Sequence, residues 1–157
     1  MSKRRKKPKL LITDGKDLDG KEIRIGVVRS IYNEIFTEVQ LNEAKQCLDE
    51  YGVDYDTLDV YGSYEITYAL QQLAQTGNYD GLVALGCLIK GETIHFNVVT
   101  QAVALSMSDL IIKHDIPIGF GVITANTRDQ ARERTWFGYD ATYATLDSII
   151  MKRSLGK

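Results

Sequence analysis

Short apolar segments alternate with amphipathic stretches along the chain, and the apolar segments predict four β-strands. Each segment is rich in apolar or β-branched residues and is bounded by polar residues or glycine, as strands usually are. The clearest is Gly81–Ile89, which is apolar throughout and therefore predicts a strand covered on both faces. The predicted strands are Glu22–Val28, Thr57–Tyr61, Gly81–Ile89 and Ile118–Thr124.

Apolar residues recur at helical spacing between these segments and after the last one. In Tyr64–Thr76 they stand at positions i, i+3, i+4 and i+7, and Gly77 follows as a natural C-terminal stop. Phe96–Lys113 is apolar on most sides, which predicts a largely buried helix. The predicted helices are Glu34–Tyr51, Tyr64–Thr76, Phe96–Lys113, a short helix opened by a capping box of Thr127 and Gln130, and about Asp140–Arg153.

Strands that alternate with helices imply right-handed crossovers and a parallel sheet with helices on both faces. The pattern therefore predicts an α/β protein, a three-layer α/β/α sandwich with a four-stranded parallel sheet. The length of 157 residues fits one such domain, which we expect over residues 10–157.

Composition narrows the functional class. The chain is 44% hydrophobic, and no apolar run reaches the roughly 18–20 residues of a membrane-spanning helix, so no membrane partner is expected. Cys47 and Cys87 stand 40 positions apart and only two histidines are present, which argues against a zinc site or a disulfide framework. The N-terminus lacks the apolar core of a secretory signal. We therefore expect a cytoplasmic protein with no metal site.

Charge is distributed unevenly. Residues 1–9 hold 6 of the 19 basic residues, which leaves 13 basic against 21 acidic residues and a net charge of −8 in the remainder. The first nine residues are predicted to be a disordered basic arm. Because the remainder offers no basic face or nucleic-acid motif, nucleic acid is not expected as a partner apart from contacts made by the arm.

Parallel sheets of this kind bind ligands at the carboxyl ends of their strands, beside a topological switch point. Four junctions therefore carry the candidate chemistry. Tyr32 follows the first strand and offers a ring that stacks on a flat heterocycle, or it is a half-buried loop residue. Ser63 and Glu65 follow the second strand, where the carboxylate suits sugar-like hydroxyls or simply a first helical turn.

The third junction is the most informative. The apolar strand is connected to the next helix by Gly91, Glu92 and Thr93. Because the first-turn amides of a helix are unpaired, this junction predicts an anion-binding site. His95 lies at this ligand edge, where an imidazole of ordinary pKa can move protons. A structural capping turn with a surface histidine is the alternative interpretation. At the fourth junction, Arg134 ends the short helix and would, taken alone, be a solvated charge.

Taken together, these junctions resemble the lumazine synthase family. The most specific blocks are ALGCLIKGETIHF and GFGVITANT, in Ala84–Phe96 and Gly119–Thr127, and weaker matches extend the resemblance from about residue 22 to 150. Three features differ from the family pattern. The usual Gly- and Lys-rich stretch after the arginine is replaced by Thr135–Tyr143, Tyr61 stands in place of a proline, and Asn97 stands where aspartate is common.

The resemblance implies a flavodoxin-like fold and a condensation of a ribitylaminouracil with a dihydroxybutanone phosphate, without metal or organic cofactor. It assigns acid/base catalysis to His95. Pyrimidine and ribityl binding would involve Tyr32, Ser63, Glu65, Leu88, Ile89 and Phe120, and phosphate binding Gly91, Glu92, Thr93 and Arg134. It further implies that Phe120 and Arg134 come from a neighbouring chain.

The resemblance also implies self-association, as a homopentamer that in some members closes into a sixty-subunit shell. The N-terminal strand Leu10–Thr13 would then add to the sheet of a neighbouring subunit. Two other functions stay open because Thr135–Tyr143 departs from the pattern. One is a structural, cage-forming relative whose chemistry has decayed. The other is a flavin-binding module without turnover.

Overall fold

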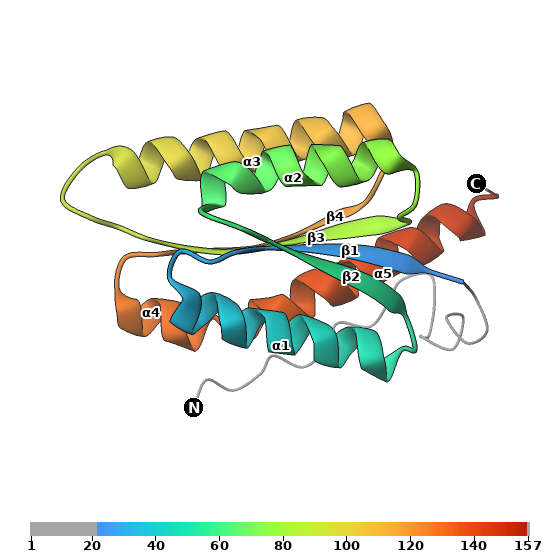
Figure 1. Cartoon of the computed structure of the whole chain (residues 1–157), viewed down its shortest axis with the longest axis horizontal. Coiled ribbons are helices and arrows are strands. Elements are labelled where there is room, and N and C mark those ends of the chain that lie inside the picture. Colours follow the sequence, from blue (N-terminus) through green and yellow to red (C-terminus); the bar gives the residue numbers. More distant parts are fainter. Residues whose placement is uncertain (1–21, 157) are drawn as a thin grey trace.

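The structure, a computed structural model, describes residues 22–156, and these form four strands and five helices. Figure 1 shows them coloured along the chain. In chain order they are β1 (Arg24–Ser30), α1 (Glu34–Glu50), β2 (Asp54–Val60), α2 (Ser63–Thr76), β3 (Gly81–Ile89), α3 (His95–His114), β4 (Ile118–Ala125), α4 (Arg128–Glu133) and α5 (Phe137–Ser154).

All four strands are parallel, in the order β2-β1-β3-β4, which confirms the predicted sheet. The chain leaves β1 toward β2 and later returns to place β3 on the other side of β1. The switch point therefore lies between β1 and β3, and the junctions that follow β1, β2 and β3 meet at one edge of the sheet. β2 and β4 are the edge strands.

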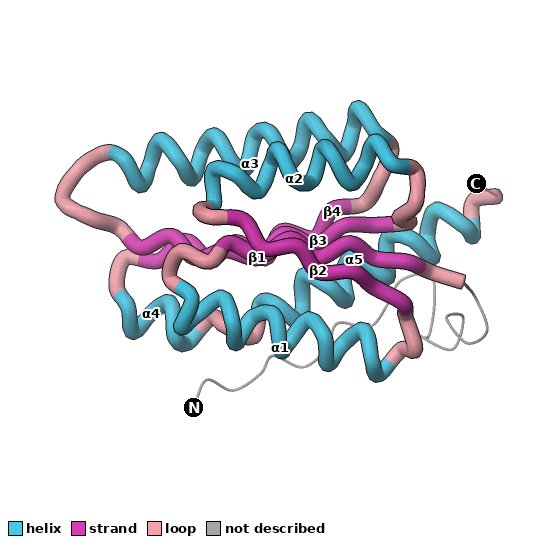
Figure 2. Tube along the Cα trace, viewed as in Figure 1, coloured by secondary structure: helices cyan, strands magenta, loops and turns pink. Residues whose placement is uncertain are grey.

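Helices cover both faces of the sheet, as Figure 2 shows. α2 and α3 lie on one face, and α1, α4 and α5 lie on the other. Strand residues alternate between the two cores, since Ile25 and Val27 pack with α1 and α5 while Val28 packs with α2 and α3. β3 is buried along most of its length, as its apolar sequence predicts.

The predicted burial of the third helix is wrong for the single chain. α3 buries only one stripe, formed by Val99, Val103, Met107 and Leu110. Leu105 is 68% exposed and Ile112 81% exposed, because the helix contacts the sheet and α2 on one side only. Its other apolar side is left uncovered by the described residues.

Two element boundaries differ from the prediction for a clear physical reason. β2 begins at Asp54 rather than Thr57, because an edge strand with an exposed face tolerates the polar residues Asp54 and Asp56. α5 begins at Phe137 rather than Asp140, since Tyr139 is buried in the core instead of lying in a loop. The capping interaction at Thr127 is confirmed, as its hydroxyl accepts from the Gln130 amide at 3.1 Å.

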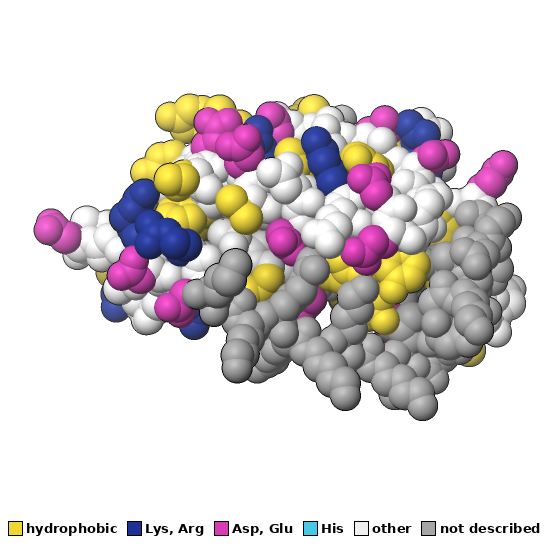
Figure 3. Space-filling model, turned by 90° about the horizontal axis from the view of Figure 1, so that it is seen from below, with side chains coloured by type: hydrophobic (Ala, Val, Ile, Leu, Met, Phe, Trp, Pro, Cys, Tyr) yellow, Lys and Arg dark blue, Asp and Glu magenta, His cyan; other side chains and the backbone are white. Residues whose placement is uncertain are grey.

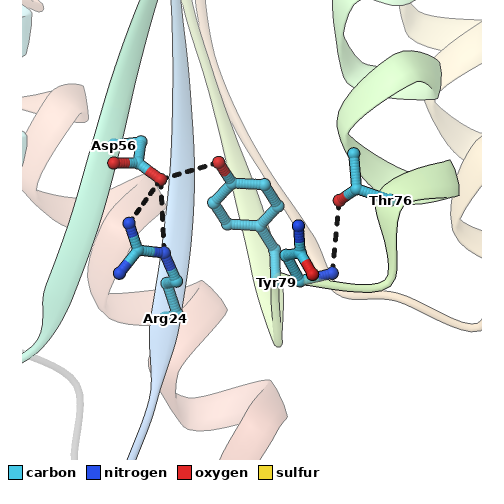
Figure 4. Close-up of polar contacts among 5 residues, drawn as sticks. Arg24, Asp56, Thr76 and Tyr79 are labelled. Carbon is cyan, nitrogen blue, oxygen red and sulfur yellow. Dashed lines mark hydrogen bonds and ion pairs between the residues drawn. The ribbon is translucent and has the colours of Figure 1, made fainter.

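At the amino-terminal end of the strands, a set of polar contacts joins β1, β2 and the loop before β3 (Figure 4). Asp56 Oδ2 accepts from Arg24 Nη2 at 2.7 Å and from the Tyr79 hydroxyl at 2.7 Å. The hydrogen bond from Tyr79 and the Arg24 guanidinium hold the pKa of Asp56 below its ordinary value. These contacts lie at the opposite end of β1 from the junctions and are structural.

The expected basic arm, residues 1–9, and the expected strand Leu10–Thr13 lie outside the described residues. Across residues 22–156, no helix combines the length and the apolar character needed to cross a membrane.

Candidate active site

The carboxyl ends of β1, β2 and β3 meet around a hollow of about 770 Å³, which we call the junction hollow. It lies between the first turns of α2 and α3 and the loop after β1. Eight of the residues singled out from the sequence line it, namely Tyr32, Ser63, Glu65, Leu88, Ile89, Gly91, Thr93 and His95. Residues separated by up to 63 positions are thus brought to one place by the strand order.

The loop after β1 presents Tyr32. Asn33 begins α1 in the left-handed conformation, with φ of 59°, and its Nδ2 donates to the Cys87 carbonyl of β3 at 2.8 Å. This bond ties the loop across the switch point. Tyr32 remains 59% exposed, so its ring is available to a ligand in the hollow.

The loop after β2 forms the second wall. Glu65 reaches back over the first turn of α2, where its Oε2 accepts from the Gly62 amide at 3.0 Å. This is the structural role that a first-turn carboxylate was expected to have, and it also fixes the carboxylate at the edge of the hollow. Ser63 is buried and lines the hollow.

Two buried hydroxyls lie beneath this wall. The oxygens of Ser30 and Ser63 have no hydrogen-bond partner among the described residues. A Cβ added to Gly86 would lie 3.1 Å from Ser30 Oγ and 2.9 Å from Ser63 Oγ. Glycine at this position of β3 therefore leaves both hydroxyls room to point toward the sheet. A buried hydroxyl without a partner costs about 1–3 kcal/mol, which suits a group that bonds to a ligand.

The loop after β3 forms the third wall. Gly91–Ile94 is exposed, and the Thr93 hydroxyl accepts from the His95 amide at 3.3 Å. α3 begins at His95, one residue before the predicted start, so the imidazole stands on the first turn of a long helix. Glu92 is exposed and does not line the hollow, which keeps its charge away from an anion at the turn.

Phe120 and Arg134 are not part of the junction hollow of their own chain. Phe120 lines a second hollow of about 430 Å³ beside β4, together with residues of α3 and α5. Arg134 ends α4, on the other face of the sheet from α2 and α3, and its Nη1 donates to the Gln130 carbonyl at 3.0 Å.

Sequence reasoning missed part of the lining. Tyr61 and Tyr64, from the loop after β2, and Val98, from α3, also border the hollow. The signal for the two tyrosines was their position at the same strand end as Ser63 and Glu65. Over residues 22–156, no group of three or more His, Cys, Asp or Glu side chains is arranged to hold a metal ion.

The chain is similar to proteins of one family over most of its length. Residues 22–153 match the model of a family described as 6,7-dimethyl-8-ribityllumazine synthase. A protein of that name from Polynucleobacter necessarius subsp. necessarius (strain STIR1) is 42% identical over 124 residues, covering 75% of this chain and 71% of the relative. One from Helicobacter hepaticus is 34% identical over 154 residues, covering 92% of this chain and 98% of the relative. A third, from Leuconostoc mesenteroides, is 34% identical over 128 residues, covering 80% of this chain and 82% of the relative.

Proposed function

The chain belongs to the 6,7-dimethyl-8-ribityllumazine synthase family, and from this premise we propose that the junction hollow is its active site. The protein is a transferase of riboflavin biosynthesis that condenses 5-amino-6-ribitylamino-uracil with 3,4-dihydroxy-2-butanone 4-phosphate. The observation that carries the assignment is that one hollow collects Tyr32, Ser63, Glu65 and His95 from three strand ends.

The chemistry needs positioning and proton transfer. The amine of the pyrimidine attacks the ketone and water leaves to give an imine. Phosphate is then eliminated, and the ring closes with loss of a second water. His95 moves the protons, since its imidazole stands exposed at the edge of the hollow, on the first turn of α3.

The pyrimidine lies against Tyr32, and the ribityl chain lies along the second wall. Leu88 and Ile89 supply the apolar floor beneath the heterocycle. The unpartnered hydroxyl of Ser63 and the carboxylate of Glu65 suit a chain of hydroxyl groups, because together they offer one donor and several acceptors. This arrangement supports a polyol as the tail of the substrate.

The phosphate binds at the turn formed by Gly91, Glu92 and Thr93, where the first amides of α3 point outward. Arg134 follows α4 on the other face of the sheet and does not line the hollow of its own chain. It instead contacts the phosphate bound in the hollow of a neighbouring chain. Basic side chains gather near the end of the molecule where α4 lies (Figure 3), which supports this role of the α4 face.

The protein assembles with itself as a homopentamer, with closure into a sixty-subunit shell as the larger form. The uncovered apolar side of α3, with Leu105 and Ile112, supports an interface there. Phe120 and the hollow beside the edge strand β4 offer a second contact surface. A neighbour on these surfaces brings Phe120 and Arg134 to a shared site.

We further propose a single domain over residues 10–157 with a basic arm before it, and a cytoplasmic location. Cys47 and Cys87 are both buried thiols, which suits a reducing compartment. The segment Thr135–Tyr143, which lacks the usual lysines, is packed rather than open, since Trp136 and Phe137 have ring centroids 4.2 Å apart.

The deciding experiment mixes the purified protein with both substrates and follows the absorbance of the lumazine product. We expect a rate well above the spontaneous condensation measured without protein. A rate equal to the spontaneous one would instead support a cage-forming relative without chemistry. Tight flavin binding without turnover would support a binding module.

A further inference from the structure

Tyr61 is an exposed aromatic residue at the end of β2 that the assigned site leaves without a role. Its side chain is 72% exposed, yet it lines the junction hollow with Tyr32. An aromatic side chain exposed inside a hollow is available to a ligand rather than to the core.

The backbone places Tyr61 beside Tyr32. The parallel ladder of β1 and β2 ends at the pair Ser30 and Val60. Two hydrogen bonds extend it, from the Ile31 amide to the Val60 carbonyl at 2.8 Å and from the Tyr32 amide to the Tyr61 carbonyl at 2.9 Å. The two tyrosines therefore lie at adjacent strand ends of the same chain, at the mouth of the hollow.

An ion pair with a buried guanidinium and a half-exposed carboxylate stabilises this position. Arg29, two residues before the ladder extension, binds Asp59 of β2 through Nε–Oδ1 at 3.0 Å and Nη2–Oδ2 at 2.7 Å. Its Nη1 also lies 3.7 Å from Glu34, in the first turn of α1. The Arg29 guanidinium thus joins the end of β1 to the end of β2 and to the first turn of α1. Tyr32 and Tyr61 are therefore held in place independently of any ligand.

We propose that Tyr61 is a second aromatic contact for the heterocycle in the junction hollow. The inference rests on the proposed function, because it takes the flat ligand to be the ribitylaminouracil. Tyr32 and Tyr61 then bind the pyrimidine from two adjacent strand ends, and Tyr61 sets affinity for that substrate without taking part in proton transfer or phosphate binding.

The ring rather than the hydroxyl makes the contact. Tyr61→Ala should weaken binding of the pyrimidine about tenfold, the factor that one base–aromatic stack is worth. Tyr61→Phe, which keeps the ring, should bind within about twofold of the unchanged protein. KM for the pyrimidine should rise with the loss of affinity, while kcat and KM for the phosphate substrate stay unchanged.

Tyr68 provides the matched control. It is a tyrosine of α2, 71% exposed, and it does not line the junction hollow. Tyr68→Ala removes the same number of atoms from the surface and should leave both substrate affinities unchanged. Thermal unfolding of all three variants should coincide with that of the unchanged protein, because both side chains are mostly exposed.

The test is calorimetric titration of each protein with the ribitylaminouracil alone, which measures binding without turnover. Weaker binding by Tyr61→Ala only, with Tyr61→Phe and Tyr68→Ala unaffected, is the expected result. Equal binding by Tyr61→Ala and the unchanged protein would overturn this inference and leave the proposed function intact. No binding by the unchanged protein would overturn both.

Discussion

Arg29 and Asp59 form a bidentate ion pair between β1 and β2, in which the guanidinium is buried and the carboxylate is half exposed. The hydrogen bond to Asp59 raises the pKa of Arg29 above its ordinary value, so the guanidinium stays charged over the whole accessible pH range. The pair thus places a buried positive charge next to the strand ends that build the site.

The two partners of this pair should differ in how much their loss destabilises the fold. Asp59→Asn leaves a buried guanidinium with only the more weakly interacting carboxylates of Glu34 and Glu38 near it among the described residues, and should lower the free energy of unfolding by about 1–2 kcal/mol. Arg29→Met leaves a carboxylate that water can solvate, and should cost less than about 1 kcal/mol. Urea unfolding at one fixed protein concentration measures both values. A larger loss for Arg29→Met would contradict this account.

Gly138 should be intolerant of any side chain. A Cβ at this position would lie 2.1 Å from the Gln40 carbonyl oxygen, because α5 crosses the backbone of α1 closely there. Gly138→Ala should therefore destabilise the protein by about 2–3 kcal/mol through forced separation of the helices. Gly91→Ala is the control, since nothing lies within 4 Å of its added Cβ. Thermal unfolding should show a lower Tm for Gly138→Ala alone.

Much of the fold could be predicted from the sequence because its signals are strong. Gly81–Ile89 matches β3 residue for residue, since a strand buried on both faces must be continuously apolar. The start of β2 at Asp54 could not be predicted from the sequence in the same way. An edge strand needs few apolar residues, so Asp54 and Asp56 give a pattern typical of a loop.

The lining of the candidate site could be predicted in part for a similar reason. Tyr32, Ser63 and His95 were found because they follow predicted strands, and parallel topology brings strand ends together. Tyr61 was missed because an exposed tyrosine near a glycine has no periodic signal. Arg134 lies away from the hollow of its own chain, so only resemblance to a family assigned it a role.

The stability of the protein should fall at alkaline pH, and Cys87 should contribute to the fall. Burial raises the pKa of the Cys87 thiol to about 12, with the Arg128 guanidinium acting weakly in the opposite direction. In the unfolded chain a thiol ionises near pH 8.5. The stabilising contribution is therefore complete below about pH 8 and is lost as pH rises toward 12.

The measurement is the free energy of unfolding between about pH 7.5 and 9, where the tyrosines of the unfolded chain, which ionise near pH 10, stay mostly protonated. Cys87→Ala lowers stability by leaving a cavity, but its stability should depend less steeply on pH than that of the unchanged protein. One group contributes a slope of at most about 1.4 kcal/mol per pH unit. Identical slopes for the two proteins would show that Cys87 does not titrate in this way.

His95 and Arg134 should serve the same active site from two different chains. His95→Ala should lower kcat by about tenfold or more, because proton transfer loses its positioned group. Arg134→Ala should chiefly raise KM for the phosphate substrate, because the guanidinium binds the anion. In the unmixed assemblies, every site lacks one of the two groups.

Co-expression of the two variants then distinguishes a shared site from a site within one chain. In a ring with a head-to-tail interface and random mixing, about a quarter of the sites receive His95 from one subunit and Arg134 from its neighbour. At a concentration of the phosphate substrate well below the KM of Arg134→Ala, where sites without Arg134 contribute little, activity should therefore recover to about a quarter of that of the unchanged protein. Each variant purified alone by the same procedure is the control. If each active site took both residues from one chain, no mixed assembly would contain a complete site, and the co-expressed sample would show only the mean of the two single-variant activities.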